Sequence, residues 1–164
     1  MRLILQRVRS ASVRVEGETV GAIGRGLLVL AAVEQGDTAV QAEEAAHKLA
    51  GLRLFQDADG KMNLDAAAAG AAYLVVSQFT LAGSLDRGRR PSFDRAAPPA
   101  EAARLLGLLV ARLRRGGFTV ETGRFGARME VELVNDGPVT FVLDVRPAGG
   151  AALTPAAGRP PGPA

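Results

Sequence analysis

The sequence predicts an α/β fold in which twisted, mostly antiparallel strands are covered by two helices. Residues 3–33 contain three apolar or alternating stretches separated by short turns at Glu16–Glu18 and Gly24–Gly26, which is typical of consecutive antiparallel strands. Residues 37–55 and 98–115 instead repeat apolar side chains every three or four positions, as amphipathic helices do. Further strands are predicted at residues 73–81, 118–122, 129–134 and 139–145.

Both predicted helices carry signals at their ends. Asp37 is a good N-cap for the first helix, which is expected to turn Val40 and Leu49 toward the core. The second helix is predicted to begin at Pro98–Pro99 and to end at Gly116–Gly117, because proline suits the first helical turn and glycine suits the residue after the last.

The composition is that of one globular domain without thiol chemistry. The chain has 164 residues, of which 48% are hydrophobic and 23% charged. The absence of cysteine excludes disulfides and thiol nucleophiles and fits a cytoplasmic protein, and no apolar run is long enough to cross a bilayer. We place the domain at residues 1–146. Residues 147–164, rich in Pro, Gly and Ala, are predicted to be a disordered tail.

A short polar stretch, Ser77–Leu81, directly follows an apolar run that should be a buried strand. In a regular strand Ser77 and Phe79 would face one side, and Gln78 and Thr80 the other. Two interpretations are open. Either the hydroxyl groups satisfy nearby backbone at a strand end, or a bent strand end presents main-chain N–H groups and a hydroxyl to a developing oxyanion.

A second polar stretch, Asn135–Thr140, is a turn signal that interrupts a predicted hairpin between residues 129–134 and 139–143. About 5–6% of X–Pro bonds in folded proteins are cis, so the sequence leaves the state of the Gly137–Pro138 bond open. A cis bond there would aim two consecutive carbonyl groups rigidly in one direction.

Neither polar stretch contains a general base. The single histidine, His47, lies on the polar face of the first predicted helix and is expected to be a solvated surface residue. Pairs of a nucleophile with an imidazole are therefore excluded, as are zinc sites, and we expect no cofactor and no metal. A site built from these stretches would use backbone donors, a hydroxyl and shape, so the substrate would supply the reactive group.

Four arginines crowd the loop after the first polar stretch: Arg87, Arg89, Arg90 and Arg95. The cluster is either a solvated loop or a patch that contacts phosphate, because guanidinium groups bind phosphate in a bidentate manner.

Six segments together resemble the D-aminoacyl-tRNA deacylase family in their order and spacing. The resemblance runs from Met1 to about Val145 and implies that family's fold, in which the sheets curl into a barrel-like core. It also implies an enzyme that hydrolyses the ester bond of D-aminoacyl-tRNA and of mischarged glycyl-tRNA while rejecting L-aminoacyl-tRNA. The segments are Gln6–Val8, Gly60–Leu64, Ser77–Leu81, Gly88–Phe93, Glu121–Ala127 and Asn135–Thr140.

The resemblance implies a cytoplasmic homodimer whose active site lies at the subunit interface. Ser77, Gln78, Phe79 and Thr80 of one subunit would form the catalytic floor that holds the ester. Gly137–Pro138 of the partner, in a cis bond, would insert into that floor and leave space for hydrogen, not for a side chain, on one face of the α-carbon. We expect the ribose 2′-hydroxyl to assist hydrolysis, because no side chain could deprotonate Thr80.

The resemblance also assigns the contacts with tRNA. Phe125 and Met129 would lie near the terminal adenosine, and Arg7 would brace the Gly-Pro loop. Arg87, Arg89 and Arg90 would contact the tRNA, although Ser84–Asp86 occupies a stretch that is usually more basic in the family. Neither a membrane nor DNA is an expected partner.

Two alternatives come from other classes of protein. A non-catalytic RNA-binding protein is disfavoured, because aromatic residues make up only 4% of the chain and offer little for base stacking. An editing domain of the same fold that removes a wrong L-amino acid is disfavoured by the intact Gly137–Pro138 pair.

Overall fold

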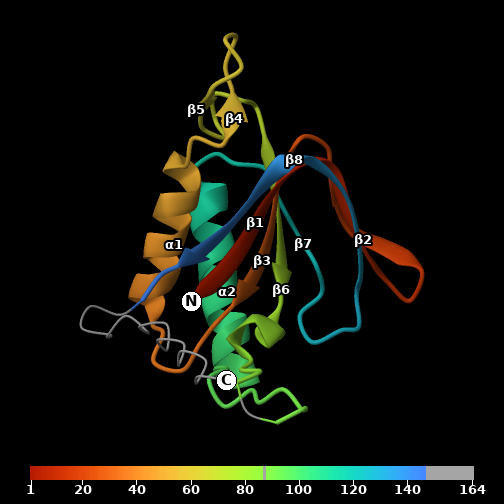
Figure 1. Cartoon of the computed structure of the whole chain (residues 1–164), viewed down its shortest axis with the longest axis vertical. Helices are drawn as coiled ribbons and strands as arrows, with labels where there is room; N and C mark the ends of the chain where they lie inside the picture. The colour runs from red at the N-terminus through yellow and green to blue at the C-terminus, as the bar shows by residue number, and fades with distance from the viewer. Residues whose placement is uncertain (87, 147–164) are drawn as a thin grey trace, which may run out of the picture.

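The structure, a computed structural model, describes residues 1–86 and 88–146, so the predicted tail at 147–164 lies outside the described residues. Two helices pack side by side against a mixed sheet that curls nearly into a barrel (Figure 1). The fold class predicted from the sequence is confirmed. The elements are β1 (Arg2–Val15), β2 (Glu18–Ile23), β3 (Gly26–Ala32), α1 (Ala39–Gly51), β4 (Phe55–Gln56), β5 (Met62–Leu64), β6 (Ala72–Ser77), the 3₁₀ turn η1 (Phe79–Ala82), α2 (Pro99–Arg115), β7 (Val120–Thr122) and β8 (Glu130–Asp144).

The main sheet has an antiparallel half and a parallel half. β1 pairs antiparallel with β2, β3 and β8, whereas β3 with β6 and β6 with β7 are parallel pairs. Parallel neighbours need long crossovers, and here α1 and α2 lie within these crossovers. The carboxyl ends of β3, β6 and β7 therefore meet at one edge of the sheet, where ligands bind in many α/β proteins.

The larger core lies between the helices and the sheet. Leu105, Leu109 and Leu113 of α2 are buried there, as the helical spacing predicts. Tyr73 of β6 is fully buried, and its hydroxyl donates to the Leu49 carbonyl (2.8 Å). This hydrogen bond ties the sheet to α1. A smaller cluster on the other side of the sheet includes Val8, Val13, Leu28, Leu74 and Val76.

The predicted start of the first helix is wrong by one residue. Thr38 is the N-cap of α1, and it forms a capping box with Gln41. Asp37 is instead buried, and it accepts a hydrogen bond from the Met1 ammonium group (2.7 Å) and another from the Glu34 amide (2.7 Å). Val40, which was expected in the core, is 65% exposed. The helix therefore begins later than its periodicity suggests.

The predicted end of the first helix is also wrong. α1 stops at Gly51, and Phe55 begins β4, which forms a small hairpin with β5 that projects from one end of the molecule (Figure 1). The turn predicted at Asp57–Gly60 lies at the tip of this hairpin, where Gly60 has a φ of +76°. The Asp57 carboxylate accepts from the Asn63 side chain (2.6 Å) and holds the turn closed.

The predicted hairpin at residues 129–143 is a single strand. Both halves of β8 pair antiparallel with β1, from Arg14 opposite Glu130 to Arg2 opposite Asp144. A hairpin would pair the two halves with each other, but the 14-residue strand β1 is long enough to pair with both. The residues between Asn135 and Thr140 bulge out of the strand, because only Arg7 of β1 lies opposite them.

Candidate functional site

The strand predicted at residues 73–81 ends at Ser77, at the carboxyl edge of the parallel strands. The Gln78 amide still donates to the Ala31 carbonyl of β3 (2.8 Å), and then the chain turns into η1. The Leu81 amide donates to the Gln78 carbonyl (3.1 Å) and closes this turn. The alternation expected for a regular strand therefore fails after Ser77.

The turn leaves two main-chain donors at its start. The first N–H groups of any helix lack partners within the helix, and here these are the amides of Phe79 and Thr80. Within residues 1–86 and 88–146, neither amide has a hydrogen-bond acceptor. The Gln78 side chain donates to the Thr80 hydroxyl and so fixes the position of that hydroxyl. Two amides and a hydroxyl are therefore available to a ligand.

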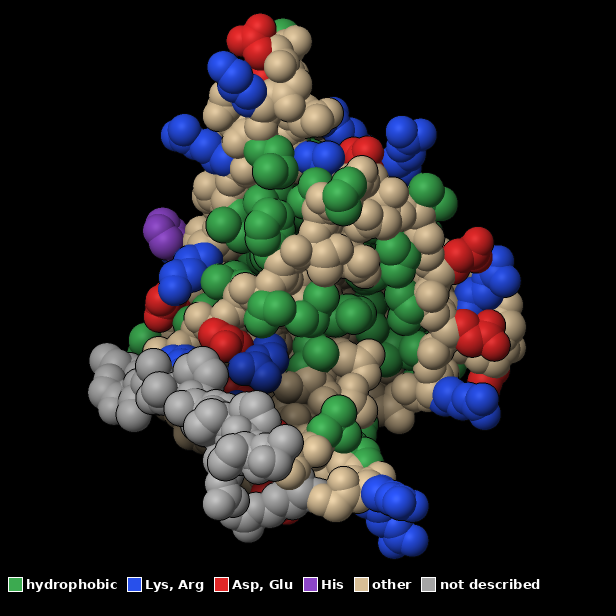
Figure 2. Space-filling view, viewed as in Figure 1, with side chains coloured by type: hydrophobic (Ala, Val, Ile, Leu, Met, Phe, Trp, Pro, Cys, Tyr) green, Lys and Arg blue, Asp and Glu red, His purple; other side chains and the backbone are tan. Residues whose placement is uncertain are grey.

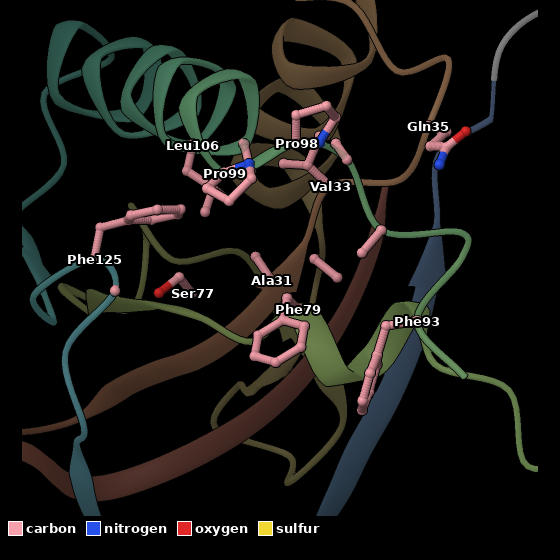
Figure 3. Close-up of a pocket in the computed structure, with 15 residues that line it drawn as sticks. Ala31, Val33, Gln35, Ser77, Phe79, Phe93, Pro98, Pro99, Leu106 and Phe125 are labelled. Atoms are coloured by element: carbon pink, nitrogen blue, oxygen red, sulfur yellow. The ribbon is translucent and has the colours of Figure 1, made fainter. Parts of the chain in front are cut away.

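A cavity of about 520 Å³ lies beside this turn, between the ends of β3 and β6 and the start of α2. All three of Ser77, Phe79 and Phe125 line the cavity, and Figure 3 shows Ser77 between the two rings. The Phe79 ring packs against Phe93 with its centroid 5.1 Å away. A volume of this size suits a small organic ligand or a nucleoside.

The lining of the cavity has no ionisable side chain, since all of its residues are apolar apart from Gln35, Ser77 and the glycine Gly126. Within the described residues, no group of three or more His, Asp or Glu side chains could hold a metal ion. His47 is exposed on α1, as predicted, and does not line this cavity. The site can bind and polarise a carbonyl group, but it contains no side chain that could act as a general base.

The two predicted adenosine contacts lie in different environments. Phe125 is 44% exposed and lines the cavity. Met129 packs against the smaller core cluster on the other side of Gly123 and does not line the cavity. A Cβ atom on Gly123 would lie 2.6 Å from the Met129 sulfur. Met129 therefore supports the segment that carries Phe125, and in one chain it does not face the cavity.

The bulge at residues 135–140 is held by a buried arginine. Arg7 is 5% exposed, and its Nε donates to the Asp136 carbonyl (2.9 Å) and lies 3.2 Å from the Asp136 carboxylate. Its Nη1 donates to the Leu54 carbonyl (2.6 Å), which links the bulge to the β4–β5 hairpin. The Asn135 side chain donates to the Arg7 carbonyl (3.2 Å). The Gly137–Pro138 bond, left open by the sequence, is cis.

A single chain does not bring the two predicted motifs together. The bulge lies opposite Arg7, whereas Ser77 pairs with Ala31 of β3, which pairs with Leu3 of β1. The four steps from Leu3 to Arg7 span about 14 Å along β1. In addition, β8 and β6 are separated by β1 and β3. Neither residue of the Gly-Pro pair lines the cavity.

The arginine cluster is only partly on the free surface. Arg89 and Arg90 are exposed in a loop whose base is closed by reciprocal hydrogen bonds between the backbones of Ser84 and Ser92 (2.8 and 3.0 Å). Arg95 is instead paired with Glu34 and holds the cavity wall. Arg87 lies outside the described residues.

Sequence reasoning missed the part of the cavity that comes from β3 and α2. Ala31, Val33 and Pro98 line it, although none of them has a functional group that would draw attention. The order strand–helix–strand, twice in succession, was the available signal. It predicts parallel strands whose carboxyl ends meet, and these residues follow or begin the elements at that edge.

Comparison with known proteins identifies relatives along almost the whole described chain. A family model described as D-Tyr-tRNA(Tyr) deacylase matches residues 4–144. The D-aminoacyl-tRNA deacylase of Geobacter sulfurreducens is 56% identical over 146 residues, covering 89% of this chain and 96% of that protein. The protein of the same name from Aeromonas hydrophila subsp. hydrophila is 55% identical over 145 residues, covering 88% and 100%.

Two solved structures have the same fold. One is named c-Myc DNA Unwinding Element Binding Protein and superposes with a TM-score of 0.84 at 38% identity, covering 90% of this chain and 100% of that one. The other, a probable eukaryotic D-amino acid tRNA deacylase, has a TM-score of 0.76 at 20% identity and covers 88% and 98%. Among the described residues, no helix is both long and apolar enough to cross a membrane.

Proposed function

Because the chain belongs to the D-Tyr-tRNA(Tyr) deacylase family, we propose that it hydrolyses D-aminoacyl-tRNA, and mischarged glycyl-tRNA, at a site shared between two copies of the chain. Membership in the family carries the coarse activity, deacylation by a hydrolase. The shared site, its chemistry and its chiral selection are argued from the contacts described above.

The observation that carries the proposal is a turn whose Phe79 and Thr80 amides have no acceptor in the described residues, beside a cavity that is lined by Phe79 and by no ionisable side chain. In the proposed reaction the ester carbonyl lies against the amides of Phe79 and Thr80. These donors stabilise the negative charge that develops on the oxygen when water attacks. The ribose 2′-hydroxyl of the terminal adenosine assists the attack, since the lining of the cavity offers no base. Ser77 and Gln78 orient the ester, and the leaving group is the 3′-oxygen of the tRNA.

Selection by chirality is assigned to Gly137 and Pro138 of the partner subunit. Both residues are exposed on the bulge, where their carbonyl groups would accept hydrogen bonds from the amino group of the substrate. Backbone placed against one face of the α-carbon leaves space for hydrogen but not for a side chain. A D-residue turns its side chain away and glycine has none, so both would be accepted. Rejection of L-residues requires only that the bulge be held rigidly, which is the role we give Arg7.

A homodimer is supported by the surface of β8. Four apolar side chains of this strand are between 37% and 64% exposed: Val131, Val134, Phe141 and Val142. Figure 2 shows hydrophobic side chains gathered across the face that β8 crosses in Figure 1. Among the strands of the described residues, β8 pairs with β1 alone, which leaves its other edge without a partner there. A long edge strand with an exposed apolar face is a surface suited to a second copy of the chain.

The tRNA is proposed to reach the site from the side of Phe125. Its terminal adenosine would fill the cavity against the Phe125 ring, with Met129 supporting that segment from behind. The exposed Arg89 and Arg90 would contact tRNA phosphates, since they lie on the loop next to the cavity wall. A cytoplasmic location follows from this substrate.

The proposal is tested with D-tyrosyl-tRNA, L-tyrosyl-tRNA and a D-tyrosyl-tRNA whose terminal ribose lacks the 2′-hydroxyl. We expect release of D-tyrosine from the first, sparing of the second, and a large loss of rate with the third. Hydrolysis of the L-ester at a comparable rate would contradict the selection mechanism. Full activity on the deoxy substrate would contradict the assistance by the 2′-hydroxyl.

A further inference from the structure

A second cavity, of about 510 Å³, adjoins the first. Ser77, Leu106 and Phe125 line both cavities, so the two hollows are continuous around these side chains. The second lies between the outer face of α2 and the carboxyl ends of β6 and β7, where Val75 and Thr122 contribute to its wall. None of the roles assigned above uses this cavity.

At the centre of α2, one residue that lines the cavity has no side chain. Gly107 lines it, and a Cβ atom added to Gly107 would meet nothing within 4 Å. Glycine in the middle of a helix is less favourable than alanine, so the packing of α2 does not explain its presence. The open space can therefore be filled from Gly107 without disturbing the core beneath.

The chemistry of the lining suits a flat apolar group that carries a phosphate. Val75 and Val110 form apolar wall, and Phe125 offers an exposed ring at the side shared with the first cavity. Arg114 also lines the cavity, where its Nε and Nη2 donate to the Val120 carbonyl (3.2 and 2.7 Å). A guanidinium has five N–H donors, so this anchor leaves others for a ligand. Within the described residues, no carboxylate pairs with Arg114.

We propose that the second cavity binds the nucleotide that precedes the terminal adenosine in the single-stranded 3′ end of the tRNA. Its base lies in the cavity beside Phe125, and its 5′ phosphate lies at Arg114. The inference rests on the proposed function, because it needs the terminal adenosine in the first cavity. Continuity of the two hollows then places the adjoining nucleotide within reach of the second one.

Two small substrates isolate this nucleotide. One is the D-tyrosyl ester of adenosine, and the other is the D-tyrosyl ester of 5′-phosphorylated cytidylyl-adenosine, which carries the phosphate proposed to lie at Arg114. Stacking and one phosphate contact predict that the full-length protein uses the dinucleotide ester about tenfold more efficiently in kcat/KM, mainly through a lower KM. The gain is expressed as the ratio of the two kcat/KM values, which a general loss of folding does not change.

Variants at Gly107 test whether the higher kcat/KM of the dinucleotide ester arises in the second cavity. Gly107→Phe fills the cavity and is expected to bring the ratio close to one, whereas Gly107→Ala keeps it. Arg112→Phe is the matched control, because it places the same ring on α2 at a position that does not line the cavity. Arg114→Gln is expected to lower the ratio about threefold. It tests the same location if Gly107→Phe fails to fold.

Each outcome is decisive. A ratio near one in the unmodified protein overturns the second subsite. A ratio that survives both Gly107→Phe and Arg114→Gln overturns its location. Failure of the unmodified protein to hydrolyse either ester, and also D-tyrosyl-tRNA, overturns the proposed function itself and is distinguishable from the other results.

Discussion

The Ser77–Thr80 turn and the 135–140 bulge lie on different strands of the same sheet and are held in different ways. The turn is fixed by main-chain hydrogen bonds, from Gln78 to β3 and from Leu81 back to Gln78. The bulge is fixed by side chains, chiefly the buried Arg7 and Asn135. The turn should therefore tolerate most side-chain substitutions, whereas the bulge should respond to single ones.

The largest effect is expected from removing a main-chain donor of the turn. Phe79→Pro deletes an N–H group that has no protein acceptor within the described residues, at a helix start where proline is tolerated. Loss of one oxyanion donor typically lowers kcat by about 10²–10³-fold. The measurement is single-turnover hydrolysis of D-tyrosyl-tRNA, with Phe79→Leu as a control that keeps the amide. Equal losses in both variants would show that the Phe79 ring matters and the amide does not.

The bulge should fail when its arginine is removed. Arg7→Met leaves the carbonyls of Asp136 and Leu54 without their donor, and we expect unfolding to become easier by about 2 kcal/mol. The D/L selectivity should also fall, because the bulge becomes mobile. Urea denaturation and paired rates on D- and L-tyrosyl-tRNA measure the two effects. If Arg7→Met loses stability but keeps full selectivity, the bulge does not depend on Arg7 for its function.

A subtler change in the bulge is Gly137→Ala. An added Cβ would lie 2.2 Å from the Asn135 side-chain oxygen and 2.3 Å from the Val139 nitrogen, so the bulge must shift. We expect hydrolysis of L-tyrosyl-tRNA to rise relative to that of the D-ester by about tenfold, since each tenfold step needs only about 1.4 kcal/mol. Gly51→Ala, whose Cβ would meet nothing within 4 Å, is the matched control. Unchanged selectivity in Gly137→Ala would remove the bulge from the selection mechanism.

The smallest effect concerns the ion pair between Arg2 and Asp144, which lie opposite each other where β1 begins and β8 ends. The hydrogen bond from Arg2 to Asp144 lowers the pKa of that carboxyl, and Arg146 adds to the effect. A depressed pKa in the folded state stabilises the protein above the unfolded pKa of about 3.9, and the contribution is lost as pH falls below it. Because the pair is partly exposed, Asp144→Asn should cost under about 1 kcal/mol at pH 7 and less at pH 2. Thermal unfolding at both pH values checks this, and an equal cost at both would rule out the charge as its source.

The sequence was sufficient for the regular elements but not for partners distant in the chain. The spacing of Leu105, Leu109 and Leu113 determines one face of α2, because that periodicity is local. Asp37 and Thr38 are both good N-caps, and the choice between them depends on the Met1 ammonium, 36 residues away. No local sequence pattern predicts this contact between Met1 and Asp37.

The candidate site also divides into features that local sequence patterns predict and features that depend on distant partners. Ser77–Thr80 and Gly137–Pro138 could be singled out because their residue types are unusual at a strand end and within a strand. That Asn135–Thr140 is a bulge and not a hairpin turn follows from the length of β1, which pairs with both halves of β8. The cavity wall from Ala31 and Pro98 depends on parallel pairing, and apolar residues give no local sign of it.

Mixing two variants that damage different motifs tests most directly whether the site is shared between copies of the chain. Phe79→Pro damages the turn and Gly137→Ala damages the bulge, so a mixed dimer contains one site with an intact turn from one subunit and an intact bulge from the other. With random exchange of subunits, half of the dimers are mixed and each has one repaired site. We therefore predict that, at equal total subunit concentration, the mixture hydrolyses L-tyrosyl-tRNA at about a quarter of the Gly137→Ala rate, because the active site of each mixed dimer has an intact bulge and is selective again. A mixture that forms mixed dimers but keeps about half of that rate, which is the average of the two parent rates, would contradict the shared site.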